Sequence, residues 1–208
     1  MGNVNPMNKT ISPDSSSEFE PMNDLAFIVG FHDEVRRNFQ MEISRINGEL
    51  GESASLSEQQ IADLEARKDL YINTFEPYLR INTFLMMVSH LEEWLFHTWK
   101  RLAPTTELLE AKGSIGRFKP VLKEIGVDLS RSKPWMFVKG CQDIRSCLLH
   151  ANGTVSLNRN PEKIHNFVAQ HTDKMEIEAD RLVLTGEFLK YFQEAVEQLI
   201  EAGNSVQD

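Results

Sequence analysis

Apolar side chains recur every three or four positions along most of the chain, which is typical of helices that bury one face. Ranges with this spacing are 24–51, a stretch from about 58, 81–102, a weaker 115–125, 134–152 and the segment after Thr185. The apolar stripe of 81–102 is the longest. It consists of Ile81, Phe84, Leu85, Val88, Leu91, Leu95, Trp99 and Leu102. The pattern therefore predicts a bundle of helices.

Several polar residues and prolines mark where these helices begin and end. Ser57, followed three residues later by Gln60, predicts a capping box, and Thr185 is a suitable cap for the last helix. Pro77 is expected to end or kink the second helix, because proline lacks an N–H and its ring clashes with the preceding turn. Pro104 is expected to stop the third helix.

One late segment changes from helical spacing to strict alternation. Met175, Ile177 and Ala179 alternate with glutamates, and two leucines follow a polar pair, which predicts a β-hairpin near 174–185. The polar stretch Met1–Pro21 predicts a disordered lead. The expected fold is all-α, with residues 22–208 forming a single helical-bundle domain that carries a small C-terminal β-hairpin.

Composition and the length of apolar runs argue against several classes of protein. No apolar run approaches the ~18 residues that a membrane helix requires, and the polar N-terminus does not resemble a secretory signal. The two cysteines, Cys141 and Cys147, fall within one predicted helix, which argues against a disulfide framework and a cysteine zinc module. We therefore expect a cytoplasmic protein with no membrane contact and no cofactor.

Charge is distributed unevenly along the chain. The formal net charge is −9, which opposes attraction to nucleic acid as a whole. Residues 117–163, however, carry nine Lys and Arg against four Asp and Glu, and include Lys139 and Arg159. This segment is either a solvated surface or a local site for an anion such as RNA.

The segment Asp143–Gly153 carries the most informative chemistry. On a helix, the apolar residues of this region fall on one stripe that should face the core, namely Phe137, Cys141, Ile144, Leu148 and Ala151. Arg145 and His150 then lie roughly 140° apart around the axis, on the side away from the core. Leu149 lies between them and suggests packing against another element or another chain.

Arginine and histidine together suit phosphodiester chemistry. A histidine can accept and return a proton near neutral pH, and an arginine fork matches phosphate oxygens. The same two residues also fit a surface arginine and a histidine at the end of a helix.

The run from Arg145 to His150 resembles the Arg-x4-His motif of HEPN (higher eukaryotes and prokaryotes nucleotide-binding) domains, and Ala151-Asn152-Gly153 resembles the helix end of that family. HEPN domains are helical bundles with a long amphipathic helix upstream of the motif. Ser146 stands where active members often have asparagine.

The resemblance implies a metal-independent endoribonuclease that acts as a homodimer and leaves 2′,3′-cyclic phosphate ends. Arg145 and His150 would be the catalytic residues, with Ser146 and Asn152 supporting them. Family members often act as toxins or in phage defence, which implies an antitoxin or a defence partner. Other members are catalytically silent nucleotide-binding or scaffold modules, which is the alternative here.

Other groups of residues offer alternative chemistry. His90, Glu93 and His97 share one helix face but lack the second ligand helix of a di-metal bundle, so we expect no metal site. Glu93 or Glu92 is instead expected to pair with Arg145 or to orient His150. Of the three tryptophans, Trp135 in the basic segment is the one expected to stack on RNA bases, beside Lys139 and Arg159.

Overall fold

The computed structural model describes residues 20–52, 54, 56–109, 115–129 and 131–205. Most of the predicted disordered lead lies outside these residues, and Pro21 is already the first residue of α1. The helices are α1 (Pro21–Gly51), α2 (Glu58–Leu70), α3 (Glu76–Leu102), α4 (Lys119–Glu124), α5 (Lys133–His150), α6 (Pro161–Ala169) and α7 (Gly186–Asn204). The strands are β1 (Met175–Glu178) and β2 (Arg181–Leu184). The expected all-α fold with a small hairpin is confirmed.

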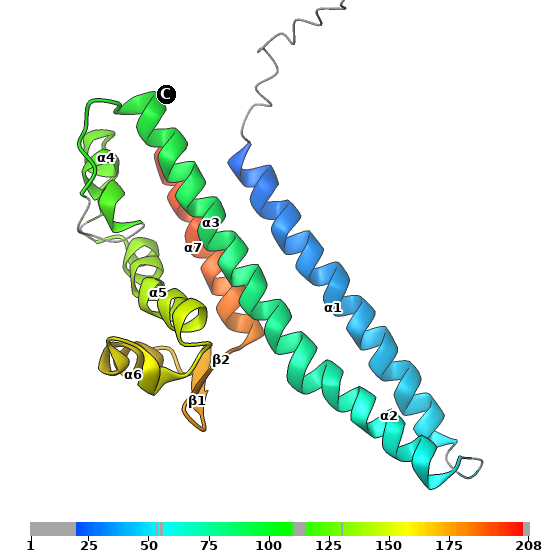
Figure 1. Cartoon of the computed structure of the whole chain (residues 1–208). Coiled ribbons are helices and arrows are strands. Elements are labelled where there is room, and N and C mark those ends of the chain that lie inside the picture. Colours follow the sequence, from blue (N-terminus) through cyan, green and yellow to red (C-terminus); the bar gives the residue numbers. More distant parts are fainter. Residues whose placement is uncertain (1–19, 53, 55, 110–114, 130, 206–208) are drawn as a thin grey trace, which may run out of the picture.

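Long helices set the shape of the molecule. Figure 1 shows α1 running beside α2 and α3 as an extended helical hairpin, with α7 behind α3 and α5 next to it. Two contacts show that α1 and α3 are antiparallel. The Nε2 of His90 donates to the backbone oxygen of Pro21 at 2.7 Å, and Arg36 pairs with Glu76 near the other end.

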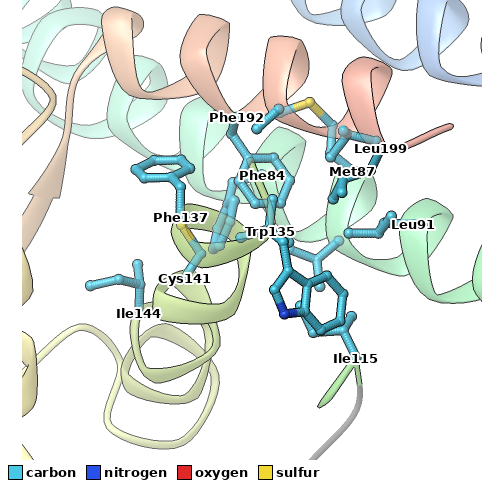
Figure 2. Packing of buried hydrophobic residues seen from close by; sticks show 14 of the residues in the cluster. Phe84, Met87, Leu91, Ile115, Trp135, Phe137, Cys141, Ile144, Phe192 and Leu199 are labelled. Carbon is cyan, nitrogen blue, oxygen red and sulfur yellow. The ribbon is translucent and has the colours of Figure 1, made fainter. Parts of the chain in front are cut away.

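The core lies where α3, α5 and α7 meet (Figure 2). The ring of Phe84 on α3 meets Phe188 and Phe192 of α7 edge-on, with centroid distances of 5.1 and 4.9 Å. Phe137 of α5 meets Tyr191 in the same geometry at 4.6 Å. Aromatic pairs in this geometry add roughly 0.5–1.5 kcal/mol beyond the area they bury, so these rings join the three helices.

The predicted hairpin and caps are confirmed. Strand β1 pairs with β2 in antiparallel register, with Met175 opposite Leu184. Ala179 and Asp180 form the turn with φ of 45° and 67°, a conformation that matches the twist of two adjacent strands. Ser57 and Gln60 form the complete capping box, and the Thr185 side chain accepts the N–H of Phe188.

Pro77 does not end the helical backbone, so of the two predicted outcomes, an end or a kink, the end does not occur. The backbone continues from α2 into α3 through one π-helical turn, Tyr71–Phe75, in which the N–H of Glu76 bonds to the oxygen of Tyr71. The wider turn accommodates the missing N–H and the ring of Pro77 without breaking the helix. Phe39 of α1 packs on Tyr71 at a centroid distance of 5.5 Å, which gives this turn a partner.

Two other elements differ from the predicted ones. The weak helix at 115–125 divides into a 3₁₀ turn, Gly116–Phe118, and the short α4. Helix α6 was not predicted, although Pro161 at its start and Ile164 and Val168 on its buried face are signals for it. Among the described residues, no helix combines the length and apolar character needed to cross a membrane.

The close approach of α5 and α6 generates a prediction about stability. A Cβ at Gly140 of α5 would lie 2.1 Å from the ring of Phe167, which is itself packed against Phe137 and His171. We expect Gly140→Ala to lower the free energy of unfolding by about 1–3 kcal/mol, because the ring must move from a packed position.

Gly30→Ala is the matched control, because a Cβ at Gly30 of α1 meets nothing within 4 Å. It should raise the free energy of unfolding by about 0.5–1 kcal/mol through helix propensity. Urea unfolding followed by circular dichroism measures both. Equal effects of the two variants would contradict the packing described for α6.

Candidate functional site

The C-terminal half of α5 presents the predicted motif on its outer side. The apolar stripe predicted for the core is buried, with Phe137, Cys141, Ile144, Leu148 and Ala151 all at most 9% exposed. This burial fixes the rotation of α5 about its axis. The side chain of Arg145 therefore lies at the surface, 29% exposed, and His150 is exposed at the last position of the helix.

The surface between Arg145 and His150 is partly apolar. Leu149 is 47% exposed, so the described chain leaves it uncovered. Ser146 is half-buried on the same side of the helix. Lys139 is exposed two turns earlier, seven residues before Ser146, and so extends this face toward the start of α5. We call the side that carries Arg145, Ser146, Leu149 and His150 the motif face.

Arg145 is held by a carboxylate from α3. Its Nη2 lies 3.9 Å from Oε1 of Glu92, and the side chain of Glu92 is 23% exposed. That Oε1 atom is buried and has no hydrogen-bond partner, so the positive charge of Arg145 compensates the negative charge of the Glu92 carboxylate. The pair orients the guanidinium and connects α3 to α5.

Glu93, predicted as a supporting residue, points elsewhere. Its carboxylate lies 3.9 Å from His97 on the surface of α3, where the two side chains are 59% and 51% exposed. Neighbouring helix positions differ by about 100°, so only one of two consecutive glutamates can face α5. The alternative, Glu92, is the one that pairs with Arg145.

The turn after α5 is fixed by the β-hairpin. Asn152 and Gly153 adopt left-handed conformations with φ of 48° and 77°, and Gly153 donates to the oxygen of Cys147 at the end of the helix. Arg181 Nη2 donates to the oxygen of Asn152 at 2.9 Å, and the N–H of Leu182 donates to the oxygen of Gly153 at 2.9 Å. Asn152 is thus exposed directly beside His150 on a backbone held from two sides.

The carboxylate of Asp180 secures the next part of the same loop. It accepts hydrogen bonds from the backbone N–H and the hydroxyl of Ser156, while the backbone oxygen of Asp180 accepts from Val155. The alternating pattern predicted the hairpin but not this role. The polar turn residues Asp180 and Arg181 were the available signal, because their side chains can bond to a neighbouring loop.

The three residues predicted to bind RNA separate in the structure. Lys139 and Arg159 are exposed. Trp135 is only 3% exposed and belongs to the core (Figure 2), so the prediction that it stacks on bases is wrong. It sits in the first turn of α5, where the 3.6-residue period turns it inward to the hydrophobic core.

Catalysis by a cysteine nucleophile or by a bound metal ion has less support near the end of α5. Cys147 lies one turn before His150, but it is fully buried, and burial raises the pKa of its thiol, with the carboxylate of Asp180 acting in the same direction. A protonated buried thiol is a poor nucleophile. Within the described ranges, no three His, Cys, Asp or Glu residues are grouped closely enough to hold a metal ion.

Comparison of the chain with family models, with curated proteins and with solved structures finds no match.

The Arg145–Glu92 pair can be tested by a double-mutant cycle. Arg145→Gln and Glu92→Gln should each destabilise the protein, and together by less than the sum, because the second change removes the charge that the first leaves unpaired. We expect a coupling of about 0.5–1.5 kcal/mol from urea unfolding.

The exposed pair Glu93–His97 on the same helix is the control, and the same cycle there should give no measurable coupling. Equal couplings for the two pairs would show that Glu92 does not hold Arg145.

Proposed function

We propose that the protein is a metal-independent endoribonuclease that acts as a homodimer through its motif face. The observation that carries the proposal is the placement of Arg145 and His150 on one outward side of α5, with the exposed Leu149 between them. Histidine can transfer the protons, and arginine can stabilise the phosphate charge, when RNA is cleaved by its own 2′-hydroxyl.

The histidine and the arginine have different roles in the reaction. The 2′-oxygen loses its proton and forms a bond to the adjacent phosphorus, while the bond from phosphorus to the 5′-oxygen breaks and that oxygen gains a proton. His150 takes or gives these protons, and Arg145 stabilises the charge that builds on the phosphate oxygens. The products are a 2′,3′-cyclic phosphate and a 5′-hydroxyl.

A dimer supplies a second histidine, which a single motif face lacks. The attacking and leaving oxygens lie on opposite sides of the phosphorus, so the base and the acid must approach from opposite directions. A two-fold interface around Leu149 brings the same patch of two chains together and gives one composite site two copies of His150. One copy then serves as base and the other as acid.

Substrate is held by local charge rather than by the charge of the whole protein. The exposed Lys139 continues the motif face along α5, and the exposed Arg159 follows the loop that ends it. These positive charges attract the phosphates next to the scissile one despite the net charge of −9. Ser146 and Asn152 present hydrogen-bonding groups beside the two catalytic residues.

The second candidate is a catalytically silent module of the same fold that binds a nucleotide or a partner protein. The observation in its favour is the Glu92 carboxylate, which offsets the charge of Arg145 in the single chain. For the enzyme, RNA phosphate must compete with Glu92 for this guanidinium. A cytoplasmic role as a toxin or phage-defence effector, with an antitoxin or defence partner, belongs to the first proposal.

Activity is tested with the purified chain, EDTA and a labelled RNA of mixed sequence. We expect cleavage that leaves 2′,3′-cyclic phosphate ends and falls at least about 100-fold in His150→Ala, because general acid–base catalysis contributes about that much. His97→Ala, which removes another exposed histidine, should cleave like the wild type. Absence of cleavage by the wild type would favour the silent module, and equal loss in both variants would exclude His150 as the catalytic residue.

The dimer is tested separately by sedimentation. Leu149→Glu should shift the protein to monomer and abolish cleavage, since a charge would be buried at the centre of the interface. Phe31→Glu is the control, because Phe31 is 57% exposed on α1, away from the motif face. Dissociation by Phe31→Glu alone would place the dimer interface on α1 and contradict the composite site.

A further inference from the structure

A polar cavity lies between α1, α3 and the N-terminal part of α7. Its volume is about 340 Å³. Basic side chains enter it from all three helices, namely His32 and Arg36 from α1, Arg80 from α3 and Lys190 from α7. None of these residues belongs to the motif face.

Two arginines in this cavity share a single carboxylate. Glu76 lies 3.4 Å from Nε of Arg36 and 3.1 Å from Nη1 of Arg80. Burial lowers the pKa of the Arg80 guanidinium, Glu76 opposes this shift, and the neighbouring charge of Arg36 adds to it. The Nε of Arg80 is buried without a hydrogen-bond partner. The two guanidiniums therefore have more hydrogen-bond donors than the Glu76 carboxylate satisfies.

His32 adds an independent sign of a missing ligand. Its side chain is only 9% exposed, and its Nδ1 lies 3.1 Å from a carboxylate oxygen of Asp33. A carboxylate can only accept, so Nδ1 is the donor in this contact. The other ring nitrogen, Nε2, is buried in the wall of the cavity and has no partner. Buried polar atoms are nearly always hydrogen-bonded, so an unpaired one beside a cavity indicates a ligand position.

The start of α7 contributes the positive end of a helix to the same cavity. Gly186 is its first residue, and the Thr185 side chain already accepts the N–H of Phe188. The first N–H groups of a helix have no acceptor within the helix, and the helix dipole favours an anion there. A Cβ at Gly186 would meet nothing within 4 Å, so this approach is open.

We propose that this cavity binds the phosphate group of a small organic monophosphate between Arg36, Arg80 and the N-terminus of α7. The guanidinium forks match phosphate oxygens, and the unpaired Nε2 of His32 lies in the wall of the same cavity. Val29, Met87 and Leu189 line the same cavity and provide an apolar wall for the organic part. Asp33 and Glu187 also line the cavity, and their negative charge opposes every additional phosphate, so we infer a ligand with a single phosphate group.

Equilibrium dialysis of the full chain with radiolabelled inorganic phosphate tests this site. We expect saturable binding of one phosphate per chain and a loss of affinity of about tenfold or more in Arg36→Gln, because a charge-assisted hydrogen bond is removed. Arg37→Gln is the matched control. Arg37 is the next residue of α1, pairs with Glu34 and does not line the cavity, so its substitution should leave the affinity within about twofold.

Arg80→Gln provides a second variant, with circular dichroism to verify that each protein is folded. Loss of binding in Arg36→Gln and Arg80→Gln, with retention in Arg37→Gln, supports the proposal. Absence of saturable binding by the wild type would overturn it. Loss of binding in Arg145→Gln, with no change in Arg36→Gln, would also overturn it, because the phosphate would then sit on the motif face.

Discussion

The edge-on contacts of Phe84 with Phe188 and Phe192 hold α3 against α7, and the contact of Phe137 with Tyr191 adds α5 to the same core. A helix whose large aromatic residue is buried in such a contact cannot rotate about its axis without losing it. The rotation of α5 decides which of its residues face solvent. The outward position of Arg145 and His150 therefore depends on a packing contact made two to four turns earlier on the same helix.

The two proposed sites draw on different parts of this fold. The motif face uses the end of α5 and a loop that the β-hairpin fixes through Asp180 and Arg181. The cavity uses α1, which packs less completely than the other long helices and buries only Leu25, His32 and Ile46 along its 31 residues. Incomplete packing of α1 beside the first turn of α7 is what leaves room for a ligand there.

The two proposed sites share one electrostatic feature. Each proposed site contains an arginine that is partly buried and paired with a carboxylate of α3, Glu92 for Arg145 and Glu76 for Arg80. Such a pair holds the guanidinium in a defined orientation before a phosphate arrives. The phosphate must then compete with the carboxylate for the guanidinium. An acidic protein can in this way bind anions at defined points while repelling them over most of its surface.

The sequence by itself determined the helical class, the late hairpin, the capping box at Ser57 and the core-facing stripe of α5. These features depend on local backbone preferences and on the period of apolar residues, both of which can be read from neighbouring positions. The end of α5 was predicted for the same reason, since Gly153 follows the last apolar residue of the stripe.

Only the tertiary structure decided which glutamate meets Arg145, that Trp135 is buried, that a π turn leads into α3 just before Pro77 and that His32, Arg36 and Arg80 surround one cavity. Each of these depends on how two helices pack. Glu92 and Glu93 differ by one residue in sequence but by about 100° around α3, and only the position of α5 selects between them. The cavity joins residues of α1 and α3 to the start of α7, at least 99 positions away in the sequence, so no pattern among neighbouring residues predicts it.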